Sequence, residues 1–160
     1  MDRIKNLKLY IELVPESCWY ENLRKVLSKN EWDTLRKEVY HKSGNKCEIC
    51  GAIGKLNCHE IWEYGDERNI QYLKGFQALC DSCHNIKHIG FVNIQISKGI
   101  WSEQVLNDLK KHFMMVNHVS SSVFRQHVKY AFGIWRKRSK EKWKTDLGNY
   151  VKNQAQKTLF

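Results

Sequence analysis

Two Cys-x2-Cys pairs constrain the fold of this chain more than any other feature of its sequence. The pairs are Cys47 with Cys50 and Cys80 with Cys83. Two intervening residues allow a tight turn that points both sulfurs at one ion, and two such turns complete the tetrahedral ligand set that zinc prefers. Gly51 directly follows the first pair, where such a turn requires a residue that tolerates a positive φ. The sequence therefore predicts one structural Zn²⁺ bound by all four cysteines.

Two disulfides are the alternative interpretation of these pairs, and the expected compartment argues against it. Residues 1–6 lack the apolar stretch of a secretory signal, and no run approaches the ~20 apolar residues of a membrane span. We therefore expect a cytoplasmic protein that does not bind a membrane, where reducing conditions favour metal ligation. The other cysteines, Cys18 and Cys58, have no partner at ligand spacing and are expected to pack as small apolar residues.

The N-terminal region, residues 1–44, is predicted to contain one strand and two helices. Leucine and isoleucine alternate with polar residues over 7–13, which is the period of a half-buried strand. Apolar residues recur at helical spacing over 16–28 and 31–42, and Asn30 is the expected N-cap of the second helix. No linker or repeat divides the chain, so we expect a single domain over residues 1–160 with an α+β, mainly helical fold.

The C-terminal region, residues 100–145, is predicted to be helical and basic. Ser102 is expected to cap a helix over 103–116, and the serines at 120–122 a second helix that continues to about residue 139. The whole chain of 160 residues carries a formal net charge of +10, which is typical of proteins with a polyanionic partner. The residues expected to contact nucleic-acid phosphates are Arg125, Lys129, Arg136, Lys137, Arg138 and Lys140. Trp135, which lies among them, and Trp143, which follows them, are expected to be core residues.

Three histidines and a glutamate lie between and just after the cysteine pairs. His59 and Glu60 follow a short apolar run, and His84 and His88 follow Cys83. If Asp81 caps a helix that begins at about Ser82, His84 and His88 share one face a turn apart, a spacing at which two imidazoles chelate one metal. We therefore expect His59, His84 and His88 to converge on a site beside the structural zinc, and this group of residues to have a metal-binding or catalytic role.

At these residues the sequence resembles the HNH endonuclease family, whose fold is also called ββα-metal or treble clef. The resemblance covers residues 45–90 and implies a zinc-bound treble-clef core between the N-terminal and C-terminal helices. The matching segments are Cys47-Glu-Ile-Cys50-Gly51, Cys58-His59-Glu60-Ile61 and Leu79-Cys80-Asp-Ser-Cys83-His84-Asn85-Ile86-Lys87-His88. Trp19-Tyr20-Glu21-Asn22-Leu23-Arg24 and His59-Glu60-Ile61-Trp62-Glu63-Tyr64 resemble a bacterial and phage subgroup with a His-Glu variant of the motif.

The resemblance implies metal-dependent hydrolysis of DNA phosphodiester bonds, with double-stranded DNA as the expected partner. In one register His59, His84 and His88 ligate a divalent cation and Glu60 is the base. Shifted by one residue, His59 is the base and Cys58 takes the ligand position. We favour the first register because a single thiolate is a poor ligand for Mg²⁺, and a three-histidine site extends the expected ions to Mn²⁺, Ni²⁺ or Zn²⁺.

One departure from the family pattern leaves other functions open. The family's central Asn falls at Gly75, which has no side chain to orient a base, so Gln71 or Gln77 would have to replace it. One alternative is a zinc-stabilised nucleic-acid-binding protein with weak or no catalysis. A second is a phage-type module that binds or inhibits a protein partner on a treble-clef scaffold.

Overall fold

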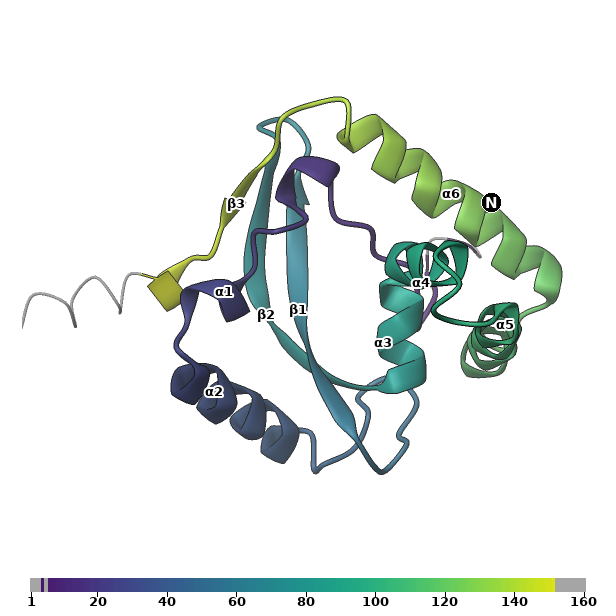
Figure 1. The fold of residues 1–160 in the computed structure, drawn as a ribbon, viewed down its shortest axis with the longest axis horizontal. Helices are drawn as coiled ribbons and strands as arrows, with labels where there is room; N and C mark the ends of the chain where they lie inside the picture. Colours follow the sequence, from purple (N-terminus) through teal and green to yellow (C-terminus); the bar gives the residue numbers. More distant parts are fainter. Residues whose placement is uncertain (1–3, 5, 152–160) are drawn as a thin grey trace, which may run out of the picture.

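The computed structural model of the chain describes residue 4 and residues 6–151. Within these residues, helices and one three-stranded sheet form a mixed α+β architecture (Figure 1). The elements in chain order are the 3-10 turn η2 (Glu16–Cys18), α1 (Leu23–Val26), α2 (Lys29–Lys42), β1 (Leu56–Gly65), β2 (Ile70–Cys80), α3 (Asp81–Lys87), α4 (Ile89–Ser97), α5 (Glu103–Asn117), α6 (Ser121–Arg138) and β3 (Lys144–Asp146).

Two of the sequence predictions concern residues that lie partly outside the described ones. Most of the N-terminal segment 1–6, and both ends of the predicted domain 1–160, lie outside the described residues. Among the described helices, none has the length and apolar character needed to cross a membrane.

A long antiparallel hairpin of β1 and β2 forms the centre of the molecule. The strands pair from Leu56 opposite Cys80 to Gly65 opposite Ile70, with a bulge where the register shifts between Ile61 and Trp62. The short strand β3 adds in parallel to the other edge of β2, giving the order β1-β2-β3. Within the described part of the chain, β1 is therefore an edge strand.

Helices lie on both sides of this hairpin. In Figure 1, α1 and α2 lie on one side of the strands, and α3 with α4 lies on the other. Because consecutive side chains of a strand point to opposite faces, neighbouring residues of β1 contact different helices. Glu60 contacts the backbone of Leu23 in α1, whereas His59 contacts His88 at the end of α3.

One hydrophobic cluster joins the N-terminal segment, the cysteine pairs and the C-terminal helices. Leu9 and Ile11 pack with Ile49 from the first cysteine turn and with residues of α3, α5 and α6. Phe113 of α5 is fully buried and lies edge-to-face on Phe124 of α6, with ring centroids 5.0 Å apart. The basic C-terminal helices are therefore anchored to the same core as the cysteine pairs.

The predicted strand over 7–13 is wrong, although the alternation correctly marks Leu9 and Ile11 as buried. Residues 8 and 9 form a bend, and no residue of 7–13 pairs with a strand among the described residues. Side chains from the C-terminal helices bond to the backbone of Leu9 and Ile11 instead. Asn117 accepts a hydrogen bond from the Leu9 N–H (2.9 Å) and donates one to its carbonyl oxygen (2.8 Å). The Ile11 N–H donates to Nε2 of His127 (2.9 Å).

The helix predicted over 16–28 is also wrong, and that over 31–42 begins earlier than expected. The first is broken into η2 and α1, since Asn22 caps a new helical turn by accepting from the Lys25 N–H. The second, α2, is capped by Ser28 rather than Asn30. Ser28 forms a reciprocal capping box with Glu31, which satisfies two free N–H groups at once.

The two C-terminal helices are confirmed as α5 and α6. Ser102 and Ser120 occupy their N-cap positions, although neither side chain makes a capping hydrogen bond. Helix α4 and strand β3 were not predicted. The three residues of β3 are too few to carry a periodic pattern, and their strand character depends on Ile70 to Tyr72 lying beside them.

Candidate functional site

The first cysteine pair lies in a tight turn that precedes β1. The Gly51 N–H donates to the Cys47 carbonyl oxygen (2.8 Å), and the Cys47 N–H donates to that of Ala52 (2.9 Å). Gly51 has a φ of +79°, so the expectation of a positive φ after this pair is confirmed.

The second pair lies where β2 passes into α3. The helix begins at Asp81 with Cys80 as its N-cap, whose sulfur accepts from the Cys83 N–H (3.5 Å). The predicted cap at Asp81 and start at Ser82 are therefore wrong by one residue. The Asp81 carboxylate instead accepts from Nδ2 of Asn57 on β1 (2.8 Å), because its side chain lies in the first turn and faces the hairpin.

The four cysteine sulfurs converge, as predicted, and could hold a structural metal ion. They all lie within 4.8 Å of one another, and Cys50 Sγ is 3.6 Å from Cys80 Sγ. Tetrahedral zinc with bonds of ~2.3 Å would separate its sulfurs by about 3.8 Å, so the geometry is compatible with a zinc site. Burial raises the pKa of Cys80 to about 11 and also raises that of Cys83. A bound cation would provide the charge that favours thiolates at neutral pH.

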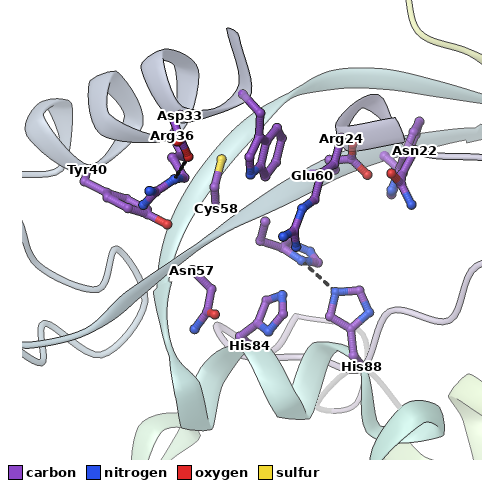
Figure 2. A pocket seen from close by; sticks show the side chains of 13 residues that line it. Asn22, Arg24, Asp33, Arg36, Tyr40, Asn57, Cys58, Glu60, His84 and His88 are labelled. Carbon is purple, nitrogen blue, oxygen red and sulfur yellow. Dashed lines mark hydrogen bonds and ion pairs between the residues drawn. The ribbon is translucent and has the colours of Figure 1, made fainter. Parts of the chain in front are cut away.

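The structure also brings His59, His84 and His88 together. One ring nitrogen of each lies within 4.8 Å of the others, and His59 Nδ1 is 3.2 Å from His88 Nε2. His84 and His88 stand side by side on α3 and at its C-cap (Figure 2), with ring centroids 4.6 Å apart. His59 is almost fully buried, whereas the other two are partly exposed.

The electrostatic environment keeps two of these imidazoles neutral. Burial, together with the charge of His59, lowers the pKa of His84 to about 4. Burial and the neighbouring histidines lower that of His88 to about 3. Since only a neutral imidazole has a free lone pair for a metal, both are available as ligands at pH 7 without losing a proton.

A buried ion pair lies behind His59, and no motif in the sequence indicates it. Glu12 Oε2 is 3.5 Å from His59 Nε2 and 3.5 Å from Lys87 Nζ. Burial disfavours the Glu12 carboxylate, but its contacts with His59 and Lys87 outweigh burial and lower its pKa. The Lys87 ammonium also lies 3.1 Å from the centre of the Tyr10 ring. Glu12 is therefore a charged partner for the far nitrogen of His59, an arrangement typical of metal-ligating histidines.

Glu60 and Cys58 lie on the other face of β1 from His59. Glu60 Oε1 accepts from the Leu23 N–H (2.7 Å), and burial raises the pKa of Glu60 to about 7. Burial raises the pKa of Cys58 to about 12, so its thiol is protonated. The ring nitrogens of His84 and His88 lie near His59. This arrangement favours the register in which His59, rather than Cys58, takes the ligand position.

Gly75 and the two glutamines near it occupy different parts of the hairpin. Gly75 pairs with Ile61, next to the bulge. Gln77 pairs with His59 and so shares its face of the sheet. Gln71 is fully buried opposite Tyr64, and its Nε2 donates to Thr145 Oγ1 (2.9 Å). Of the two proposed replacements for the family's Asn, only Gln77 is beside the histidines.

A pocket of about 450 Å³ lies along β1. Side chains from both faces of this strand line it, including His59 on one face and Glu60 on the other. His84 and His88 line one wall, and residues of α1 and α2 line the other (Figure 2). The edge strand contributes His59 and Glu60 between them. The histidines and Glu60 therefore line the same pocket.

The basic residues of the C-terminal region lie away from this pocket. Arg125, Lys129, Arg136, Lys137 and Lys140 are exposed on and just after α6, and none of them is among the described residues that line the pocket.

Arg138, Trp135 and Trp143 make contacts within the fold. Arg138 pairs with Asp66 through two contacts of 2.8 and 2.9 Å and lies over the Tyr64 ring. Trp143 is buried, as predicted. Trp135 is half-buried and stacks on Trp19.

Comparisons of the chain with family models, curated proteins and solved structures find no match.

Proposed function

We propose that this chain is an HNH-type, metal-dependent endonuclease with a treble-clef core, which hydrolyses DNA phosphodiester bonds. The observation that carries the proposal is the convergence of His59, His84 and His88 within 4.8 Å beside a four-cysteine cluster that shares α3 with two of them. The cysteines would bind a structural Zn²⁺, and the histidines a second divalent cation, Mg²⁺, Mn²⁺, Ni²⁺ or Zn²⁺.

The residues of the pocket have complementary roles in this proposal. A cation held by the three imidazoles would supply the Lewis acid that hydrolysis of a phosphodiester requires. Glu60 removes a proton from the attacking water, and its pKa of about 7 suits a base that works near neutral pH. Glu12 holds the ring of His59 through Nε2, which leaves Nδ1 facing His88.

The charge distribution supports DNA as the substrate. The exposed basic residues of α6 can contact phosphates independently of base sequence, and the excess of 27 basic over 17 acidic side chains favours a polyanion. The two groups of residues lie apart, so α6 would hold the duplex at a distance from the cut.

A plasmid-nicking assay tests the proposal. The zinc-loaded protein is incubated with supercoiled plasmid and Mg²⁺, Mn²⁺, Ni²⁺ or added Zn²⁺, with and without a chelator. We expect nicking with at least one ion and none after chelation. Absence of cutting with every ion, in protein shown to be folded by circular dichroism, would contradict the enzyme assignment.

Gly75 favours a second candidate function, a nucleic-acid-binding protein that cuts weakly or not at all. A salt titration of DNA affinity tests this candidate against a purely protein-binding module. The logarithm of the association constant should fall linearly with the logarithm of the salt concentration. Replacing both Arg136 and Lys137 with glutamine should reduce the slope by about 2, whereas a slope near zero would contradict nucleic-acid binding.

A further inference from the structure

The pocket beside the histidines contains side chains that the proposed chemistry does not use. Several have structural partners. Arg36 is held by Asp33 at 2.7 Å, and Asn22 caps α1. Three others, Arg24, Trp32 and Trp62, line the pocket without such partners.

Arg24 is the pocket's free cation. Its side chain is exposed, and among the described residues it makes no ion pair, hydrogen bond or ring contact. Its neighbour Lys25 lies over the Tyr20 ring, 4.7 Å from the centre, and does not line the pocket. An unpaired guanidinium offers the forked donor geometry that matches a phosphate.

Trp32 and Trp62 differ from the other tryptophans of the chain. Trp19, Trp101, Trp135 and Trp143 each pack against another aromatic ring. Within the described residues, Trp32 and Trp62 have no ring partner, and both are half-buried in the pocket wall. They come from α2 and β1, so the faces of two separate elements present unstacked indoles to one hollow. Indole rings of this kind stack with nucleobases of any sequence.

We propose that this pocket binds one unpaired nucleotide, with Arg24 on its phosphate and Trp32 and Trp62 against its base. The substrate is accordingly single-stranded, gapped or frayed at the reacting position, and the basic face of α6 holds the adjoining duplex. The volume of about 450 Å³ is in the range of pockets that enclose a small ligand. Cleavage at this nucleotide rests on the proposed nuclease function, whereas binding of the nucleotide in the pocket does not.

Fluorescence anisotropy with the full, zinc-loaded chain and no second metal tests the binding alone. The probes are one labelled DNA strand in three forms: free, in a continuous duplex, and in a duplex whose complementary strand lacks a few central nucleotides. We expect the gapped probe to bind about tenfold more tightly than the continuous duplex. Arg24→Gln and Trp62→Ala should each remove most of that difference, since the base and its phosphate belong to one nucleotide that binds as a unit, and stacking of one base is worth about tenfold.

Matched controls separate this effect from general loss of charge or fold. Lys25→Gln removes a neighbouring positive charge outside the pocket, and Trp19→Ala removes a partly exposed tryptophan elsewhere. Both should keep the preference for the gapped probe. Trp32→Leu provides a second pocket variant if Trp62→Ala does not fold, as judged by circular dichroism.

The outcomes for the pocket and for the nuclease are distinguishable. Equal affinity for the gapped and continuous duplexes, or equal effects of Arg24→Gln and Lys25→Gln, would overturn the nucleotide pocket even if plasmid is cut. A preference that depends on Arg24 but comes without cleavage would support the pocket and contradict the nuclease.

Discussion

The cysteine cluster and the histidine cluster both include residues of α3, but they differ in burial and in the number of ligand atoms that they offer. Cys83 and His84 are consecutive residues of α3, yet Cys83 is fully buried whereas His84 lines the pocket. The cysteines offer four ligand atoms, enough to fill the coordination of a zinc ion, whereas the histidines offer three, which would leave a position open on a bound ion. A saturated site stabilises a fold, whereas an open site can bind substrate, so the two clusters are suited to different tasks.

The cysteine cluster lies next to the elements that hold the histidines. Cys80 ends β2 and begins α3, while the first cysteine turn leads directly into β1. A metal shared by the two pairs would therefore hold the strand of His59 against the helix of His84 and His88. Five predictions test the two clusters, in order of decreasing effect.

Removing a cysteine ligand should abolish both folding and function. Cys80→Ser leaves three thiols in the cluster, and we expect the free energy of unfolding to fall by more than about 4 kcal/mol. Thermal unfolding with and without added zinc measures this loss. Cys18→Ser, at a buried cysteine outside the cluster, is the control; an equal loss in both variants would contradict a structural metal.

Removing a histidine ligand should abolish function but keep the fold. His88→Ala removes one of three ligands, so binding of the second metal and plasmid nicking should both be lost, while zinc content stays unchanged. Isothermal titration with Mn²⁺ and metal analysis of the purified protein measure the two sites separately. His41→Ala, at an exposed histidine of α2, should change neither; loss of zinc in His88→Ala would show that the sites are not separable.

Replacing the proposed base should slow cleavage without affecting either metal. Glu60→Gln should lower the rate about 10²–10⁴-fold. In the wild type, the rate should rise about tenfold per pH unit up to about pH 7 and then level off, because only the ionised carboxylate accepts a proton and its pKa is about 7. A rate profile that levels off near pH 5 would contradict Glu60 as the base, and Glu63→Gln on the same strand is the control.

The same raised pKa has a consequence for stability. The folded protein keeps the proton of Glu60 at pH values where an unfolded chain has released it, so this group's contribution to stability falls between about pH 4.5 and pH 7. Glu60→Gln should remove this part of the pH dependence, as measured by chemical denaturation at a series of pH values.

The smallest effect is expected for Glu12→Gln, at the buried carboxylate next to His59. Glu12→Gln keeps the size of the side chain but removes the charge that faces His59 and Lys87. We expect affinity for the second metal to fall about 10–100-fold, with zinc content unchanged. Titration calorimetry measures the affinity, and Glu16→Gln at an exposed position is the control; equal affinity in both variants would assign Glu12 a purely structural role.

The parts of the fold that were predictable have local causes. A turn of four residues determines how Cys47 and Cys50 face one ion, and helical spacing determines that α5 buries Leu109 and Phe113. Predictions failed where partners are distant in sequence. Leu9 and Ile11 alternate like a strand, but Asn117 and His127 supply the hydrogen bonds that a neighbouring strand would have made.

The candidate site was predictable only in part, for the same reason. His59 was identified because it lies between the cysteine pairs in a segment that resembles the family's motif, and His84 and His88 because they follow Cys83 at helical spacing. Glu12 lies in a segment with no recognisable motif, and its role depends on Lys87 and His59 meeting it in the core. Arg24 belongs to a segment that the family resemblance marked, but nothing in that segment indicated that it faces the histidines.

The sequence by itself determined the two ligand sets, because the residues of each pair are close enough along the chain for local backbone geometry to orient them. Only the tertiary structure decided that β1 is an edge strand and that α1 and α2 complete a pocket opposite the histidines. Those features depend on which distant segments pack together, and that packing reflects burial of the whole chain rather than the conformational preference of any short segment.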